Sequence, residues 1–337
     1  MDQNKRILFF QNANEFADRH STNVCGFDML KKRLGTESKY GEVFQADLKY
    51  RTSPVHAAVK LMPINMQNLH EIEYYVDFNK LVISNINPHF PLVFFSKTCK
   101  QCPFRARNVA DCYVIMKEFA NGDLKTWLKS YHSVQEHLSY LAQIAIVIIG
   151  LTQKRVIHND LHWGNMLFHK TPKNNMDRYM YYTVDGHQVY IKMKGYHWVV
   201  WDFGLSKKYS SSRPTKNAFS IDLHRICGVV DWVNDRESSH KPLPSSIIEL
   251  YDAIDDTTEA ARNTTTPSDG VQTAIYFLLY TLKPYMDYID NTILIIDPTT
   301  PPEHVINPDQ PYNVTSAAAA PPAKRRKRIP TQKKQLM

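Results

Sequence analysis

The sequence has no uninterrupted run of about 20 apolar residues, the length that a membrane-spanning helix requires. Its longest apolar run covers residues 144–151, and the short apolar stretch 7–10 after a polar start is not a secretory signal. Hydrophobic residues still make up 43% of the chain and charged residues 22%, which favours a folded protein over a disordered one. We therefore expect a folded protein with no membrane partner.

Cysteine is scarce, since the 337 residues include only five, at positions 25, 99, 102, 112 and 227. An odd, widely spaced set in a chain of this length does not suggest a disulfide framework. Cys99, Cys102 and Cys112 hint at zinc, but a structural zinc site needs four ligands and no fourth is suitably spaced. The cysteines therefore predict free thiols in a reducing, intracellular compartment.

Acidic residues are absent from the C-terminal end, residues 324–337, which carries seven of the chain's eight net positive charges. The rest of the chain is therefore nearly neutral. The basic cluster follows a Pro-, Thr- and Ala-rich stretch that begins at residue 297 and that its prolines should keep irregular. We expect 297–337 to be a disordered linker with a basic tail. Residues 324–334 would contact a polyanion or an import receptor, or would simply be solvated.

The remaining chain divides by hydrophobic pattern into an N-terminal extension (1–29), a β-rich region (30–120) and a mostly helical region (121–296). In the β-rich region the pattern predicts strands at 34–48, 55–62, 90–95 and 112–116. It predicts one helix, at 69–83. In the helical region, caps at Asp123 and Ser133 each start a helix, and further helices are expected near 244–262 and 270–290. Asp185-Gly186 predicts a hairpin within 179–192.

Two acidic motifs follow apolar segments in the helical region, VIHNDLHWGNML at 156–167 and VVWDFGL at 199–205. A solvated acid needs no such apolar flanks. Two carboxylates and an amide held between short strands suit Mg²⁺, which binds hard oxygen ligands together with the phosphates of a substrate.

In these residues the sequence resembles the protein kinase superfamily, with its His-x-Asp-Leu-x-x-x-x-Asn and Asp-Phe-Gly motifs. The resemblance implies an α+β, bilobal protein-kinase-like fold with ATP and Mg²⁺ as cofactors. It implies that Asp160 accepts the proton of the substrate hydroxyl and that Asn165 and Asp202 hold the metal ions. Leu167 would lie under the adenine.

Upstream residues match further parts of the kinase pattern. Ala57-Ala58-Val59-Lys60 resembles the Val-Ala-Ile-Lys strand, which assigns Ala58 and Lys60 to the nucleotide site. A lysine at the end of an apolar strand needs a partner. We expect that partner to be Glu71 rather than Glu73, because Glu71 shares the apolar face of helix 69–83. The hinge should lie within 115–124, with Met116 beside the adenine pocket.

The glycine-rich loop of the family is degenerate in LGTESKYGEV, residues 34–43. When the family pattern is aligned on Val43, Gly41 alone falls on a glycine position, while Thr36 and Ser38 occupy the other two. Gly35 fits only with one inserted residue. Missing glycines weaken the approach of backbone N–H groups to phosphate, although Thr and Ser hydroxyls can still donate hydrogen bonds.

Several departures point to one branch of the superfamily. Asn159 replaces the usual Arg before the catalytic Asp, and His162 stands where most serine/threonine kinases place a Lys near the γ-phosphate. Ala-Pro-Glu is missing, and Asp222 looks like the acid that braces the catalytic loop. Over about 30–290 these features are similar to haspin-type kinases and to the serine/threonine kinases of large DNA viruses.

This similarity implies transfer of the ATP γ-phosphate to Ser or Thr hydroxyls of protein substrates. We expect a viral enzyme, because the chain lacks the long N-terminal extension of cellular haspins, located in the host nucleus or cytoplasm or in the virion. Two alternatives stay open. Choline- and aminoglycoside-type phosphotransferases share the first motif but usually lack Asp-Phe-Gly-Leu-Ser, present at 202–206. A catalytically weak pseudokinase scaffold would explain the degenerate glycine loop.

Overall fold

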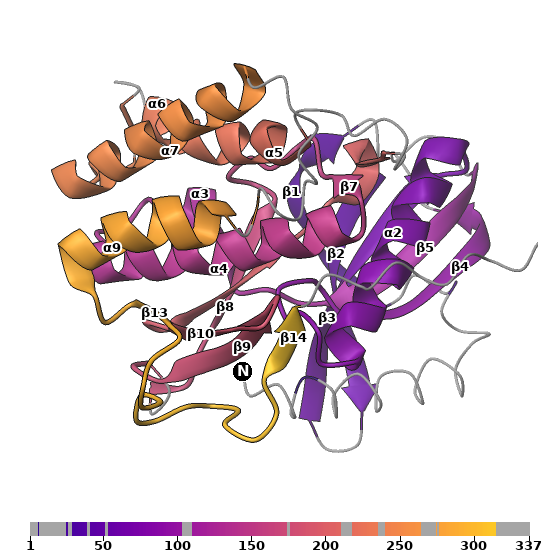
Figure 1. Cartoon of the computed structure of the whole chain (residues 1–337). Helices are drawn as coiled ribbons and strands as arrows, with labels where there is room; N and C mark the ends of the chain where they lie inside the picture. The colour runs from indigo at the N-terminus through magenta and orange to yellow at the C-terminus, as the bar shows by residue number, and fades with distance from the viewer. Residues whose placement is uncertain are drawn as a thin grey trace, which may run out of the picture.

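Five antiparallel strands near the N-terminus form one sheet in the order β1-β2-β3-β5-β4 in the computed structural model (Figure 1). Their bounds are β1 (Leu30–Ser38), β2 (Gly41–Tyr50), β3 (Ser53–Pro63), β4 (Val93–Cys102) and β5 (Ala110–Glu118). The sequence pattern predicted 34–48 as one strand, whereas the structure has two, β1 and β2. The structure describes residues 6, 25, 29–38, 41–50, 53–102, 110–173, 176–209, 218–234, 240–263, 274 and 276–314.

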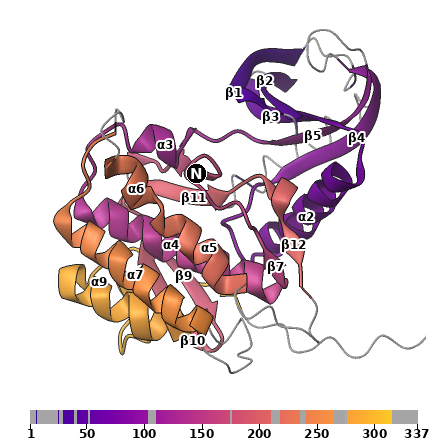
Figure 2. The ribbon, with the colours of Figure 1, turned by 90° about the horizontal axis from the view of Figure 1, so that it is seen from above.

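One helix, α2 (Met66–Ile83), packs against this sheet and completes the small lobe. The side chain of Asn65 caps its N-terminus by accepting the N–H of Asn68 at 2.8 Å. Phe78 stacks on Phe90 with ring centroids 4.3 Å apart. Seen from above, the five strands stand apart from the helices that follow in the chain, and α2 lies between these strands and the rest of the protein (Figure 2). The fold therefore has the two lobes, one β-rich and one helical, that the kinase resemblance implied.

The larger lobe is built on helices, with three small sheets in the orders β13-β10-β9-β14, β11-β8-β6 and β12-β7. Its helices are α3 (Leu124–Trp127), α4 (Val134–Gln153), η3 (Phe203–Leu205), α5 (Ala218–Cys227), α6 (Val229–Asn234), α7 (Ser245–Asn263), η4 (Phe277–Leu282) and α9 (Lys283–Asp290). Its strands are β6 (Gly122–Asp123), β7 (Val156–Ile157), β8 (Met166–Lys170), β9 (Tyr179–Val184), β10 (His187–Lys192), β11 (Tyr196–Val200), β12 (Lys207–Lys208), β13 (Leu294–Ile296) and β14 (Tyr312–Val314).

Helix α4 forms the centre of this lobe. It begins with the predicted capping box, in which the Ser133 side chain and the Glu136 side chain each accept the other residue's backbone N–H. On length and composition α4 would be able to cross a membrane, but 83% of its most apolar window is buried inside the protein. It is thus packed as a core helix.

The Pro-rich segment after residue 296 continues the fold as far as Val314, which corrects the prediction of a disordered linker from 297. Strand β14 pairs in parallel with β9, and Tyr312 and Val314 are buried (Figure 1). Asn307 accepts the N–H of Tyr181 at 3.0 Å and donates to its carbonyl at 2.9 Å. Proline disfavours helix interiors and central strands, but it permits an extended edge segment held by side-chain hydrogen bonds. Residues 315–337, including the basic tail, lie outside the described residues.

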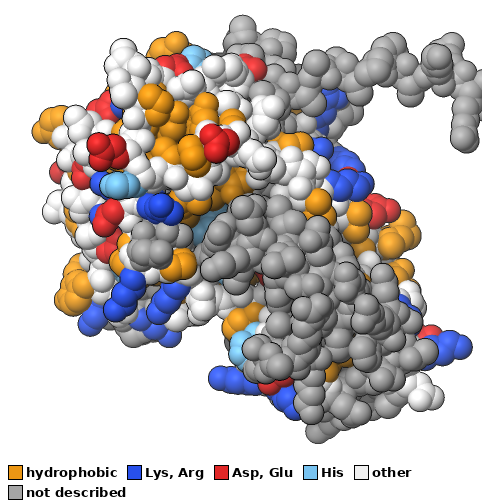
Figure 3. Space-filling model, turned by 90° about the horizontal axis from the view of Figure 1, so that it is seen from below, with side chains coloured by type: hydrophobic (Ala, Val, Ile, Leu, Met, Phe, Trp, Pro, Cys, Tyr) orange, Lys and Arg blue, Asp and Glu red, His pale blue; other side chains and the backbone are white. Residues whose placement is uncertain are grey.

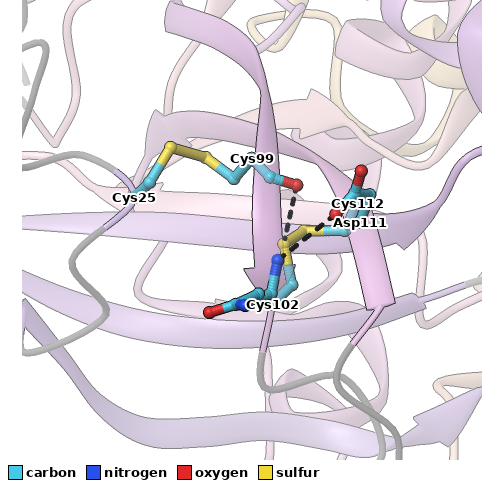
Figure 4. The surroundings of a disulfide bond; sticks show 6 residues. Cys25, Cys99, Cys102, Asp111 and Cys112 are labelled. Atoms are coloured by element: carbon cyan, nitrogen blue, oxygen red, sulfur yellow. Dashed lines mark hydrogen bonds between the residues drawn. A yellow bond between two sulfur atoms is a disulfide. The ribbon is translucent and has the colours of Figure 1, made fainter.

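Four of the five cysteines pair in the small lobe, which corrects the prediction of free thiols. Cys25 bonds to Cys99 on β4, and Cys102 on β4 bonds to Cys112 on β5 (Figure 4). Cys227 is a free, buried thiol. Disulfides persist in oxidising surroundings and are rare in the reducing cytosol. The correction concerns the pairing of the thiols, and the predicted compartment stays a prediction.

Reduction of these disulfides should lower the free energy of unfolding by about 2–4 kcal/mol for each bond. We expect alkylation of the denatured, unreduced protein to modify Cys227 alone and reduction beforehand to expose all five thiols. Mass spectrometry and urea midpoints with and without a phosphine reductant measure both effects. The variant Cys227→Ser should show the same loss on reduction. Full alkylation without reduction would contradict the pairing.

Buried histidines predict a loss of stability on mild acidification. Burial lowers the pKa of His89 to about 3 and those of His137 and His158 to about 4. Between pH 6.5 and 4 the unfolded chain therefore binds protons that the folded chain does not. Stability is full above this window and falls as the pH drops through it, by roughly 3 kcal/mol for His158 alone. Burial raises the pKa of Asp222 to about 7, so the folded chain binds a proton there before the unfolded chain does. This offsets part of the stability that the histidines lose on acidification.

Urea unfolding at several pH values tests this prediction. His137 packs edge-on against Trp127 at 4.8 Å, so His137→Phe should keep an aromatic contact and make stability less dependent on pH. The exposed His304 provides a control, and His304→Gln should leave the dependence unchanged. A wild-type stability that does not fall between pH 7 and 4.5 would contradict the prediction.

The surface of the described residues mixes both signs of charge on the face seen from below (Figure 3). Lys and Arg side chains lie near Asp and Glu side chains around hydrophobic ones.

Candidate active site

The β3 lysine stands at the centre of the candidate site. Lys60 Nζ donates to Glu71 Oε1 at 2.6 Å and to Asp202 Oδ1 at 2.8 Å. Glu71 on α2 is fully buried, whereas Glu73 points to solvent, so the lysine pairs with the glutamate that the helical periodicity favoured. Burial would lower the pKa of Lys60, but Asp202 and Glu71 together raise it, so the ammonium form is held.

Two antiparallel strands bring the two acidic motifs together. Strand β8 begins directly after Asn165, and β11 ends two residues before Asp202, with Met166 opposite Val200. The N–H of Trp201 donates to the carbonyl of Asn165 at 2.9 Å. Since the start of β8 and the end of β11 meet at one edge, residues 37 positions apart in sequence lie on neighbouring chain segments.

Asn165 is oriented by the catalytic loop itself. Its Nδ2 donates to the carbonyl of Asp160 at 2.9 Å and to Asp160 Oδ2 at 3.2 Å. The amide nitrogen is thereby turned toward Asp160, which leaves the amide oxygen directed elsewhere. Burial, with Asp202 adding to it, raises the pKa of Asp160 although His162 lowers it.

His162 lies beside Asp160, with Nε2 3.7 Å from Asp160 Oδ2. The N–H of Gly164 donates to His162 Nδ1 at 3.0 Å. Because Nδ1 accepts this hydrogen, a neutral ring carries its proton on Nε2, the nitrogen nearer to Asp160. A side chain at Gly164 would require His162 to move, since a Cβ would lie 2.9 Å from His162 Cε1.

An acid on α5 braces the catalytic loop, as the sequence predicted for Asp222. Its two carboxylate oxygens accept the N–H groups of His158 and Asn159, both at 2.8 Å. Asn159 has φ +61°, a left-handed conformation that Asn tolerates better than most residues. Its side chain donates to the carbonyl of Leu205 at 3.3 Å. The residue that replaces the usual Arg therefore ties the loop to the segment after Asp-Phe-Gly.

Some of the residues predicted to border a nucleotide lie on one face of the small-lobe sheet, and the side chains of others are outside the described residues. Val43 and Ala58 share the Lys60 face of the sheet, because Val43 lies opposite Lys60 and Ala58 is two residues away on β3. Leu167 lies on β8, opposite Val199. Gly35, Thr36 and Ser38 lie on β1 by their backbone, but their side chains are outside the described residues.

Gly41 is constrained by packing as well as by its predicted role. It has φ +154°, and a Cβ there would lie 2.6 Å from the carbonyl oxygen of Leu61 on β3. The strand β2 can begin so close to β3 only with a glycine at this position.

Met116 does not lie where the sequence placed it. It stands opposite Val59 on β3, so it faces away from Lys60, and its neighbour Lys117 stands opposite Ala58 on the Lys60 face. The prediction was one residue out of register, and such a shift reverses the face of every side chain on a strand. The sequence did hold a sign of this arrangement, because Lys117 lies within the mostly apolar segment 114–119.

The N-terminal extension reaches the hinge through Arg6, a contact with no signal in the sequence. Its guanidinium is fully buried and forms two hydrogen bonds with Glu118, at 2.6 and 3.0 Å. It also donates to the carbonyls of Pro88 and Phe90. Arg6 and His169 hold the pKa of Glu118 well below its usual range, against the effect of burial.

The donor set of this site fits a magnesium-bound phosphate. Asp202 offers a carboxylate of which Lys60 engages one oxygen, and Asn165 offers its amide oxygen. Within the described part of the chain, no group of three or more His, Cys, Asp or Glu side chains could hold a metal ion. Mg²⁺ is commonly bound by one or two carboxylates together with substrate phosphates, and this site offers one carboxylate and one amide oxygen.

The model of the protein tyrosine and serine/threonine kinase family matches residues 29–222, more than half of the chain. The chain therefore belongs to this family and carries a protein kinase domain, the domain of a phosphotransferase that acts on proteins. No curated protein matches the chain.

Proposed function

We propose that the protein is an ATP- and Mg²⁺-dependent serine/threonine protein kinase, of the kind that large DNA viruses encode. One observation carries the proposal: Lys60 is bonded at once to Glu71 and to Asp202. Protein kinases need this lysine–glutamate pair and the metal-binding Asp in place together. A scaffold without activity would have no need to keep a buried lysine–glutamate pair in contact with a second carboxylate.

Each residue has a role that its geometry supports. Asp160 accepts the proton of the attacking hydroxyl, and Asn165 holds Asp160 in place. Asn165 and Asp202 would hold Mg²⁺, which when bound neutralises the charge that develops on the phosphates. Lys60 orients the phosphates while Glu71 keeps its ammonium aligned.

Specificity for Ser and Thr is supported by the His162 position. Its Nε2–H lies next to Asp160, where the lysine of most serine/threonine kinases would approach the γ-phosphate. A donor at this position can stabilise the transferred group as it leaves ATP.

Incubation of the full chain with Mg²⁺ and γ-labelled ATP tests the proposal, with a mixed protein substrate, a poly-Glu-Tyr polymer, choline and an aminoglycoside as acceptors. Label on Ser and Thr after acid hydrolysis is the expected result. Label on Tyr, or on the small alcohols alone, would overturn the assignment of the acceptor, and no transfer in the wild type would overturn the enzyme.

Matched variants separate catalysis from contamination. Glu71→Gln removes the buried carboxylate that aligns Lys60, and we expect a loss of at least about tenfold. Glu73→Gln changes an exposed residue on the same helix and should keep wild-type transfer. Equal activities of the two variants would contradict the role given to the Lys60–Glu71 pair.

Gly164→Ala should reduce the turnover by between about ten- and a hundredfold, because the new methyl group would displace His162 from Asp160. His162→Ala should cause a similar loss, and the double variant should be no worse than either single one. Steady-state transfer rates measure this. Additive losses would show that Gly164 acts through something other than His162.

A further inference from the structure

Lys117 is a buried lysine at the back of the candidate site that the proposed mechanism does not use. Its side chain is fully buried, and its position opposite Ala58 places it on the same face of the sheet as Lys60. Lysine is almost never fully buried without a partner, because removing an ammonium ion from water is costly. Its contacts should therefore reveal what it does.

Those contacts are with two aromatic side chains. Lys117 Nζ donates to Tyr75 Oη at 2.6 Å. The same nitrogen lies 3.6 Å from the ring centroid of Trp201 and 3.9 Å from that of Tyr75. Burial lowers the pKa of Lys117 well below its usual range, whereas the negative faces of the two rings attract its ammonium form where water is excluded. Lys117 is thus held firmly at one place.

Tyr75 links this lysine to the Asp-Phe-Gly motif. Its Oη also accepts the backbone N–H of Asp202 at 2.9 Å. Asp202 has φ +62°, an uncommon conformation for a residue other than glycine, and such conformations persist only where the surroundings determine them. The hydrogen bond from Asp202 to Tyr75 is one such restraint.

The helix α2 is thereby held by two lysines from two strands. Lys60 on β3 binds Glu71, and Lys117 on β5 binds Tyr75, one helical turn further on. Both lysines are also linked to Asp202. Lys60 donates directly to its carboxylate, and Lys117 is connected through Tyr75 Oη, which accepts the backbone N–H of Asp202.

We propose that Lys117 is a positioning residue for phosphoryl transfer, which fixes the backbone of the metal-binding Asp202 through Tyr75. The inference rests on the proposed kinase function but is tested separately from it. Geometry carries the proposal, because Tyr75 Oη is shared between Lys117 Nζ and the backbone N–H of Asp202.

The test uses Lys117→Met, Tyr75→Phe and their double variant in the full chain. Methionine keeps the length of the side chain without its charge or its donors, and phenylalanine keeps the ring without the accepting oxygen. The matched controls are Lys100→Met, an exposed lysine on β4, and Tyr74→Phe, whose ring lies near Lys208 and Phe203. Melting temperatures show whether each variant is folded.

The first readout is hydrogen exchange of the Asp202 amide, which does not require activity. We expect exchange to be about tenfold faster in both single variants and unchanged in the controls, because the amide loses its fixed acceptor. Unchanged exchange in both Lys117→Met and Tyr75→Phe would overturn the proposal and leave Lys117 as a residue that only fills space.

The second readout is the Mg²⁺ dependence of transfer. A displaced Asp202 should raise the Mg²⁺ concentration for half-maximal turnover by about tenfold, with little change in KM for ATP at saturating metal. The double variant should match the single ones, since both act through one hydrogen-bonded chain. If the wild type transfers no phosphate, the proposed function fails while the exchange measurement still decides the role of Lys117. A loss that is additive, or that leaves the Mg²⁺ dependence unchanged, would overturn the link to Asp202.

Discussion

Asp160→Asn should lower the turnover by about a thousandfold and leave KM for ATP nearly unchanged. The side chain keeps its size but can no longer accept a proton from the attacking hydroxyl. Asn165 still donates to the carbonyl of residue 160 at 2.9 Å, so the loop should keep its shape. The loss therefore falls on the chemical step rather than on nucleotide binding.

Steady-state transfer at varied ATP concentration, together with direct nucleotide binding, measures both quantities. The exposed Asp309 offers a matched change, and Asp309→Asn should behave as the wild type. Turnover above a tenth of the wild-type value in Asp160→Asn would show that this carboxylate is not the base.

Lys60→Met should abolish transfer and also destabilise the protein by about 3–5 kcal/mol, because it leaves the buried carboxylate of Glu71 without its cation. Glu71 is fully buried, and its Oε2 already lacks a hydrogen-bond partner among the described residues. In the wild type, the hydrogen bond from Lys60 at 2.6 Å compensates for the cost of burying this charge. The stability loss is thus expected to come mainly from Glu71.

The double variant Lys60→Met/Glu71→Gln separates the two effects. Replacing the carboxylate by a neutral amide should recover most of the stability but none of the activity, since no cation remains to orient phosphate. Urea unfolding and transfer assays measure the two. A double variant as unstable as Lys60→Met would place the stability loss elsewhere, at Asp202 or in the packing of the methionine.

Elements whose signals are local could be predicted from the sequence. Asp123 and Ser133 cap α3 and α4 because a cap depends on residues within one helical turn. The Asp185-Gly186 turn closes the hairpin of β9 and β10 for the same reason. The segment 297–314 was missed because its order depends on partners more than 100 positions away, such as Tyr181 for Asn307.

The disulfides show the same limit. Cysteine count and spacing suggested free thiols, yet Cys25 and Cys99 are 74 positions apart and meet at the small lobe. No spacing rule connects a residue in the N-terminal extension to a strand, because the distance between them is set by how the chain folds across the sheet.

By itself the sequence determined the chemical groups of the site. Asp160, Asn165 and Asp202 stand in short motifs, and the period of α2 distinguished Glu71 from Glu73, because these signals lie within one loop or one helix. The tertiary structure alone decided which side chain of β5 faces Lys60. Side chains alternate along a strand, so the choice between Met116 and Lys117 depends on the register between β3 and β5, which only the folded sheet defines.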